Sequence, residues 1–448
     1  MVGLLIACVS LVAGALILLG WDRLHPRSAR RAAPWITLAA LLIGVAGTGV
    51  PSGPPTGGLL GVLQPDAWSG LWRGLLLLGL ALRLVLEPGF GEPSPNASAV
   101  HALQLLAAAG ATLAISTRDL LLLTLGVVLY ATADANARPA AREQAPWVRP
   151  LGVGALAFGT SLVYAATATL DLDGIASLLW ERPGPQAALL YLGVGLLIAG
   201  LALLTRLLTW RATSEPATGS DAVTGVATLG RVCLGAFGAL GPVWGWLLAS
   251  VGLLLMVQGW LAARRRHDQA RVKALHGAQA GLLLVALASA PTRAGLLALI
   301  MAGVAFWLAE LIVATIARIT QYEGPDAEVY TGLHRRNPWL GGAALVGLLS
   351  LAGLPLTLGF AGRAALAWAA RDGDAGGLIV AALAVLLSAL CAADYLQVLL
   401  TIYRASAGNQ RVRVSSYVLV LLLIAASALL VLAVYPSLFS AWVTRIVG

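Results

Sequence analysis

The sequence predicts an all-α membrane protein with about fourteen transmembrane helices. Of its 448 residues, 59% are hydrophobic and only 11% are charged, whereas soluble domains carry about a quarter charged residues. Fourteen separate apolar stretches approach the roughly 20 residues that a helix needs to cross the hydrocarbon core of a bilayer. Arginines crowd the connections on only one side of these stretches. These three observations predict a multi-pass protein of the cell inner (plasma) membrane.

Each predicted span is a largely apolar run between more polar connections. In chain order, the spans are residues 2–20, 34–50, 66–87, 99–116, 118–135, 147–169, 186–210, 222–239, 241–262, 273–290, 294–318, 339–363, 375–403 and 414–440. The first span has no basic leader and no evident cleavage site after it, so we expect a retained helix rather than a signal peptide. The connections are too short for a soluble domain, so any redox or ATP chemistry is expected in other proteins.

The distribution of basic residues predicts the orientation of the chain. With the N-terminus outside, the odd-numbered connections face the cytoplasm and hold nineteen basic residues, whereas the even-numbered connections and the C-terminal tail hold five. The positive-inside rule therefore predicts that both termini are non-cytoplasmic. The same asymmetry explains the net charge of +9, so we expect lipid, and not nucleic acid, as a partner.

The sequence offers no recognisable site for a metal or cofactor. Cys8, Cys233 and Cys391 all fall inside predicted spans, without a CxxC pair or a Cys/His cluster, and are expected to be small core residues. Nucleotide-binding, iron-sulfur and haem motifs are also missing from the sequence. We therefore expect no cofactor in this chain.

The most informative side chains are the ionisable ones inside the predicted spans, because each costs at least about 2.5 kcal/mol to insert. The candidates for an ion pathway are Arg206, Arg231, His276, Glu310, Arg363 and Asp394. Glu310 and Asp394 could instead form buried ion pairs with arginines that only hold the bundle together. His276 could be an interfacial residue near the start of its helix. Arg73 and Arg83 lie nearer span ends and are expected to be interfacial anchors.

The twelfth span carries the most specific local signal, the segment LLSLAGLPLTLGFAGR from Leu348 to Arg363. Pro355 removes a backbone hydrogen bond, and Gly353, Gly359 and Gly362 weaken the helix further. The segment is therefore predicted to be a broken helix in the middle of the membrane. Irregular backbone at that depth is tolerated only where it is buried in protein or lines a watery cavity, and a broken helix beside buried charges indicates an ion pathway.

This segment resembles the LSLAGIPPLAGFFGK motif of the antiporter-like, proton-conducting subunits of respiratory complex I, with Arg363 where that family has a lysine. The nearest likeness is to the N-subunit branch of the bacterial NADH-quinone oxidoreductases. Cation/proton antiporter and membrane hydrogenase subunits are similar to it. Weaker matches in the expected order are Asp66-Ala-Trp-Ser, Asp119 to Gly126, Ala166 to Asp171, and Asp394-Tyr395 to Tyr403-Arg404.

The resemblance implies two inverted five-helix repeats, spans 4–8 and 9–13. The chain then divides into helices 1–3 (residues 1–98), a first repeat (99–239), a second repeat (240–404) and helix 14 (405–448). It also implies a non-redox subunit that couples electron transfer elsewhere to proton translocation. Its expected partners are other membrane-arm subunits, which would bind NADH, flavin, iron-sulfur clusters and quinone.

The sequence departs from this family at several ionisable positions, most of them in the first repeat. Val128 stands where the family has a glutamate, Leu204 where it has a lysine, and Gln279 where it has a histidine. Arg206 and Arg231 lie near the family's lysine positions. Because arginine stays protonated at any realistic pH, we hypothesise that the first half-channel is inactive and that any proton movement uses Glu310, His276 or Asp394 near Arg363.

Three functions are compatible with the sequence, and the first of them is favoured. The chain could be a proton-translocating subunit of a complex I-like enzyme, or a member of the cation/proton antiporter or membrane hydrogenase branch. It could also be a structural paralogue that seals the membrane arm without pumping.

Overall fold

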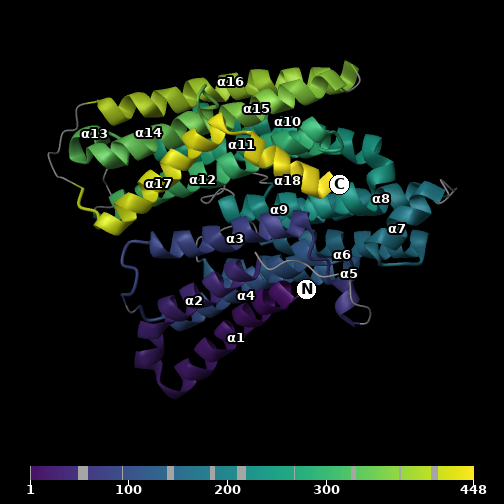
Figure 1. Ribbon diagram of the computed structural model, residues 1–448, viewed down its shortest axis with the longest axis horizontal. Helices are drawn as coiled ribbons and strands as arrows, with labels where there is room; N and C mark the ends of the chain where they lie inside the picture. Colours follow the sequence, from purple (N-terminus) through teal and green to yellow (C-terminus); the bar gives the residue numbers. More distant parts are fainter. Residues whose placement is uncertain are drawn as a thin grey trace.

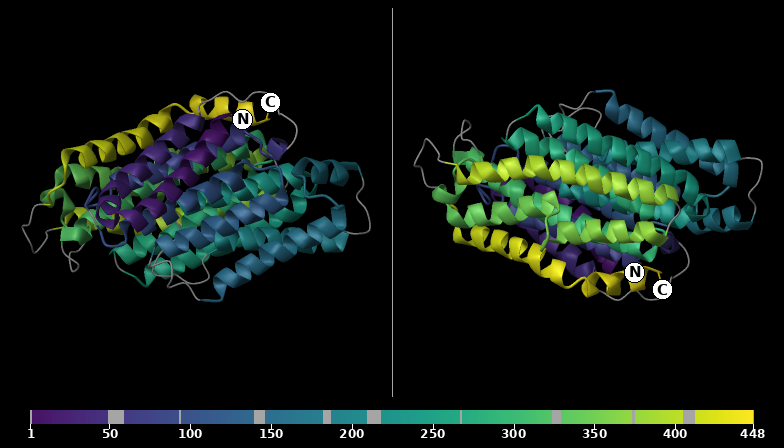
Figure 2. Two further views of the ribbon diagram at one scale, coloured as in Figure 1. Left: turned by 90° about the horizontal axis from the view of Figure 1, so that it is seen from below. Right: turned by 90° about the horizontal axis from the view of Figure 1, so that it is seen from above.

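The computed structural model describes residues 2–48, 59–92, 94–138, 146–181, 187–208, 218–266, 268–323, 329–372, 375–404 and 412–447. These residues form a bundle of helices that run mostly along its long axis (Figures 1 and 2). Within them, pairing of the β type is limited to two isolated bridges. Eleven helices are long and apolar enough to cross a membrane. The protein is therefore an all-helical membrane protein.

The helices fall into two halves along the chain. The first half contains α1 (Val2–Leu24), α2 (Pro26–Thr48), α3 (Ala67–Val85), α4 (Ala97–Ser116), α5 (Leu120–Ala137), α6 (Val148–Thr167), α7 (Leu172–Glu181), α8 (Ala187–Leu204) and α9 (Gly219–Gly230). The second half contains α10 (Gly241–Arg264), α11 (Asp268–Ser289), α12 (Arg293–Glu323), α13 (Leu333–Arg336), α14 (Pro338–Ala352), α15 (Leu358–Ala369), α16 (Ala375–Tyr403), α17 (Ser416–Val434) and α18 (Ser437–Val447). The remaining helical segments are three short 3₁₀-helices, η1 (Leu59–Val62), η4 (Gly238–Leu240) and η5 (Ala370–Asp372), and one π-helix, η3 (Arg231–Ala236).

Helix α12 forms the centre of the second half. It packs against α11, α14, α15 and α17, and it also contacts α9 and α3 of the first half. The hydrophobic window of α12 is 94% buried, against 28% for α16 and α17. Helix α16 lies at the edge of the bundle in Figure 1, and α17 lies along an edge in Figure 2. A side chain in the middle of α12 is therefore enclosed by protein rather than exposed on the outer surface.

Side-chain caps fix where several of these helices begin. Asp66, Asp119, Thr218, Asn337 and Thr357 each accept a hydrogen bond from a backbone N–H in the first turn of the helix that follows. Such caps satisfy donors that have no partner within the helix. The caps at Thr218 and Thr357 place α9 and α15, the two helices that carry much of the polar chemistry.

Helix α2 begins well before the predicted start of its span at residue 34. It starts at Pro26 and carries three arginines in its first two turns. Proline is favoured at the first helical position because its missing N–H has no helical partner there. The hydropathy pattern marks only the apolar part of a helix, and so it missed this charged beginning.

Two further predicted spans differ from the structure, and one helix was not predicted. The fourteenth span, predicted to end at residue 440, is interrupted between α17 and α18 at Pro436. Helix α7 was not predicted because it is a short helix inside a connection. The seventh span, predicted to reach residue 210, ends as a helix at Leu204, and Arg206 follows in a left-handed turn with φ of 59°. Residues 209 and 210 lie outside the described part of the chain.

Candidate functional site

The break in the twelfth span lies between α14 and α15. Helix α14 ends at Ala352, Gly353 adopts φ of 73°, and α15 begins only at Leu358. The carbonyl of Leu351 would accept from the backbone N–H four residues later in a continuous helix, but that residue is Pro355, which has none. The break therefore leaves a buried carbonyl that needs another donor.

Arg363 and Gln279 supply donors at this carbonyl. Arg363 Nη2 donates to the Leu351 oxygen at 2.7 Å, and Gln279 Nε2 donates to it at 2.8 Å. Arg363 also donates to the carbonyl of Gly359 at 2.9 Å and to Gln279 Oε1 at 3.2 Å. Arg363 is 8% exposed. The guanidinium is thus a buried, fixed cation bound to the interrupted backbone.

Two glycines allow the backbones to meet at this point. A Cβ on Gly359 would lie 1.9 Å from the carbonyl oxygen of Ser350, and one on Gly362 would lie 2.9 Å from the backbone nitrogen of Ala302 in α12. Both distances exclude a side chain without movement of the backbone. The glycines therefore place α15 directly against α14 and α12.

Glu310 and His276 line one large cavity between the two halves of the bundle. The cavity has a volume of about 510 Å³. Glu310, in the middle of α12, is 6% exposed, and its Oε2 accepts from the backbone N–H of Gly219 at 3.2 Å. None of the ion pairs in the described residues involves Glu310. His276 in α11 is 4% exposed, and its Nε2 has no hydrogen-bond partner.

The structure does not join Asp394 to Arg363. Asp394 lies in α16 and is buried, and no ion pair or hydrogen bond within the described ranges connects the two side chains. Asp394 does not line the cavity beside Glu310. The cations that act on its carboxylate are Arg271 and Arg264. Of the three predicted proton carriers, Glu310 and His276 therefore share a cavity that Asp394 does not line.

Arg206 belongs to a buried cluster in the first half that the sequence reasoning largely missed. Its Nη1 lies 3.5 Å from Asp221 Oδ2 and 3.9 Å from Asp134 Oδ2. Arg138 makes an ion pair with Asp134 and another with Asp221 at 3.1 Å. Tyr130 donates its hydroxyl proton to Asp221. Two arginines and two aspartates thus neutralise one another between α5, α8 and α9.

One signal in the sequence could have found part of this cluster. Asp134 falls inside the predicted fifth span, residues 118–135, and is a membrane charge of the same kind as Glu310. Asp221 precedes the predicted eighth span by one residue. Val128 stands where the family has a glutamate, and neither Asp134 nor Asp221 stands at that position. The comparison with the family therefore did not indicate these two aspartates. Val128 itself packs against the apolar core.

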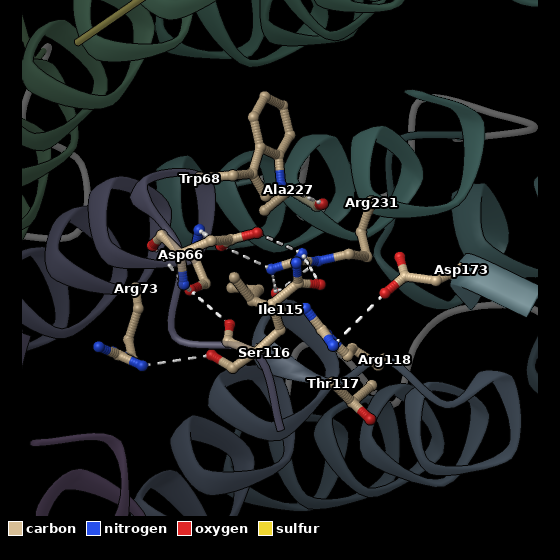
Figure 3. A network of polar contacts seen from close by, with 12 residues as sticks. Asp66, Trp68, Arg73, Ile115, Ser116, Thr117, Arg118, Asp173, Ala227 and Arg231 are labelled. Atoms are coloured by element: carbon tan, nitrogen blue, oxygen red, sulfur yellow. Dashed lines mark hydrogen bonds and ion pairs between the residues drawn. The ribbon is translucent and has the colours of Figure 1, made fainter. Parts of the chain in front are cut away.

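Arg231 lies in a third polar network, at the beginning of α3 (Figure 3). It forms a two-point ion pair with Asp66, with Nη1 at 2.6 Å and Nη2 at 2.9 Å from the carboxylate oxygens. Its Nε and Nη2 donate to the carbonyl of Ile115, and Nη1 donates to Gln64. Arg231 therefore ties the end of α4 and the start of α3 to α9.

The same contacts determine the pKa of the Asp66 carboxylate. Burial raises its pKa, but the charge of Arg231 and the hydrogen bonds from Arg231 and Ser69 outweigh burial and hold the pKa below its usual value.

Nearby, Arg73 is 3% exposed and donates to Ser116 Oγ at 3.3 Å, as Figure 3 shows. The prediction of an interfacial anchor at Arg73 is therefore wrong, because the side chain faces α4 inside the bundle.

These arrangements differ in what they can do chemically. The arginines at positions 206, 231 and 363 are all held by carboxylates or carbonyls, and an arginine does not release its proton. Glu310 and His276 can both exchange protons, and both line a polar cavity. The described residues contain no group of three or more His, Cys, Asp or Glu side chains arranged to hold a metal ion.

Comparison with known proteins agrees with this architecture. Residues 118–390 match the family model described as the transmembrane region of NADH:quinone oxidoreductase and Mrp antiporters. NADH-quinone oxidoreductase subunit N 1 of Sorangium cellulosum is 32% identical over 84% of this chain and 81% of its own length. Subunit N 2 of Acidobacterium capsulatum is 31% identical over 90% of both chains.

Solved structures share the fold over nearly the whole chain. A chain of respiratory complex I from Thermus thermophilus has a TM-score of 0.72 and 26% identity, covering 97% of this chain and 98% of its own. A chain of the Mrp complex from Dietzia has a TM-score of 0.75 at 17% identity, covering 99% and 96%, which shows the fold alone. From the family match, the identity to the N subunits and the shared fold, this chain belongs to the NADH:quinone oxidoreductase/Mrp antiporter transmembrane family.

Proposed function

We propose that this chain is an N-like membrane-arm subunit of an NADH-quinone oxidoreductase that takes part in coupling electron transfer to proton translocation. Its curated relatives are named as N subunits of that enzyme. In this proposal the chain crosses the membrane fourteen times as two inverted repeats, with both termini outside the cytoplasm. NADH, flavin, iron-sulfur clusters and quinone bind to partner subunits.

One observation carries the role in proton movement. Glu310 is a buried carboxylate at the edge of a cavity of about 510 Å³, without an ion pair among the described residues. A carboxylate placed in a membrane bundle at such a cost is expected to have a function. His276 lines the same cavity and provides a second exchangeable group. Proton movement through the second half would therefore use Glu310 and His276.

The buried ion pairs of the first half support a structural role for that half. Its buried cluster pairs Arg138 and Arg206 with Asp134 and Asp221, and Arg231 is bound by Asp66. Fixed arginines cannot load and release protons, so the first half would stabilise the bundle without conducting. If the second half also conducts no protons, the chain is a structural paralogue that seals the membrane arm.

Proton transport by the assembled complex tests the proposal. Purified complex in proteoliposomes is driven with NADH, and proton uptake is normalised to NADH oxidation. Glu310→Gln is expected to lower the number of protons moved per NADH, and the double variant Glu310→Gln/Asp394→Asn tests both predicted carboxylates. The matched control is Glu87→Gln, which removes an exposed carboxylate from the same cavity. An unchanged ratio in the double variant would establish the structural role instead.

A further inference from the structure

The cavity beside Glu310 is built from both halves of the chain and carries more charge than the proposed proton path requires. Its lining includes Arg83 from α3, Arg138 at the end of α5, Lys273 from α11 and Arg318 from α12. The carboxylates in the lining are Glu87 and Glu310. Four separate elements thus direct cations at one space, which indicates a site for an anion.

Most of these cations have no carboxylate partner. Within the described parts of the chain, the ion pairs include Arg138 but not Arg83, Lys273 or Arg318. Arg138 uses only Nη2 for Asp134 and Asp221, and its Nε and Nη1 are buried without a hydrogen-bond partner. Arg318 is within electrostatic reach of Arg83 and Arg138 as well as of the two carboxylates of the lining, Glu310 and Glu87, so the cations outnumber the carboxylates around it. Like charges held together in this way favour binding of a counter-anion.

The remaining lining has the character of an amphiphile site. Gln104 and His276 add polar side chains to the lining, and His276 Nε2 is buried and unpartnered. The apolar part of the wall consists of Val100, Val272, Val313, Ala314 and Ala317. A water molecule takes up about 30 Å³ in the liquid, so a cavity of about 510 Å³ holds a much larger group.

We propose that this cavity binds a phosphate group, with Arg83, Arg138, Arg318 and Lys273 as its ligands. Guanidinium groups match phosphate oxygens through paired N–H donors, and lysine adds a point charge. The phosphodiester of an anionic phospholipid and free inorganic phosphate share this chemistry. The four cations are not proposed proton carriers, so binding of phosphate can be measured separately from proton movement, although Glu310 and His276 line the same cavity.

Ligand binding by the purified full-length chain tests the site and separates the two sources. Delipidated protein is titrated in detergent with phosphatidylglycerol, with phosphatidylcholine and with inorganic phosphate, and the dissociation constant is measured by the shift in unfolding temperature. Tighter binding of phosphatidylglycerol than of phosphatidylcholine, or binding of inorganic phosphate alone, supports the proposal and identifies the source. Equal binding of the two lipids without binding of phosphate overturns it.

Variants locate the binding to this cavity. Arg318→Gln is expected to raise the dissociation constant at least about tenfold, because the phosphate loses a charge-assisted hydrogen bond. Arg318→Lys keeps the charge and should recover part of the affinity. The matched control is Arg335→Gln, which removes an exposed arginine that does not line the cavity. An equal loss of affinity in the control, or no loss in Arg318→Gln, would overturn the assignment.

Should Arg318→Gln fail to fold, the wild-type chain still decides the question. Native mass spectrometry after mixed-lipid exchange counts the phospholipid molecules that remain bound to it. Retention of phosphatidylglycerol that excess inorganic phosphate displaces supports a shared phosphate site. Retention of both lipids in proportion to their supply contradicts it.

Discussion

Arg363 donates to the carbonyl of Leu351 at 2.7 Å, across the break that separates α14 from α15. Arg363 stands where the family usually has a lysine. In the structure, its guanidinium mainly donates hydrogen bonds to backbone carbonyls. One planar guanidinium reaches the carbonyls of Leu351 and Gly359 and the side chain of Gln279. The residue predicted as a station in a proton path therefore stabilises the broken helix.

Arg363→Met is expected to lower the free energy of unfolding by about 1–3 kcal/mol, because the buried carbonyls of Leu351 and Gly359 each lose a hydrogen bond from a charged donor. Arg363→Lys should lose less, since an ammonium group keeps the charge but cannot match the guanidinium fork. Unfolding temperatures of the purified variants in detergent measure both effects. A methionine variant as stable as the wild type would show that the carbonyls do not depend on this donor.

Gly353→Ala is expected to destabilise the break more than an ordinary glycine substitution. Gly353 has φ of 73°, and a Cβ there would lie 2.6 Å from Arg363 Nη1. The left-handed conformation alone costs a residue with a Cβ about 1–2 kcal/mol, and the contact would also displace the guanidinium. Unfolding temperature is the measurement.

Gly342→Ala is the matched control for that substitution. Gly342 lies in α14, and a Cβ there would meet nothing within 4 Å. Alanine is favoured over glycine inside a helix by roughly 0.5–1 kcal/mol, so this variant should be slightly more stable than the wild type. Equal losses in both variants would mean that the backbone conformation at Gly353 is not the cause.

Asp221→Asn is expected to be among the most destabilising substitutions in the first half. Asp221 is fully buried and compensates both Arg138 and Arg206. Removing one partner of a buried ion pair costs about 3–5 kcal/mol because the other charge remains. Adding Arg206→Met to Asp221→Asn removes the excess cation and should recover part of the loss. A purely additive double variant, measured by thermal unfolding, would contradict this electrostatic coupling.

The ion pair between Asp66 and Arg231 should give a stability that depends on pH. Because the folded-state pKa of Asp66 is lowered, its contribution is fully present above the unfolded pKa of about 3.9 and is lost as the pH falls through the folded pKa. Asp66→Asn should therefore be less stable than the wild type at pH 7. The difference in unfolding temperature should shrink below about pH 4. A difference that stays constant down to pH 3 would assign the loss to the cap of α3.

Much of the architecture was predictable because hydropathy reports burial in lipid directly. Every predicted span contains a helix of the structure, and the segment around Pro355 is interrupted where proline and glycine indicate. The predicted helix ends were less accurate. The charged beginning of α2 gives little hydropathy signal, and so do the short helices α7 and α18. The positions of these segments depend on helix caps and packing.

The candidate site was less predictable for a physical reason. A sequence shows which charges enter the membrane, but their partners come from helices far apart in the chain. Asp66 and Arg231 are separated by 165 residues, and Asp221 meets Tyr130 across 91. From the sequence, Arg206, Arg231 and Arg363 were therefore expected to be chemically alike. In the folded chain, each of them has a different set of partners. Only Glu310 and His276 were brought to a common cavity.

The first turn of α9 holds contacts from both halves of the protein. The backbone N–H of Gly219 binds Glu310, and two residues later Asp221 binds Arg138 and Arg206. One helical turn therefore joins the buried carboxylate of the second half to the buried arginines of the first, so each half is anchored to the other through neighbouring residues of the same backbone.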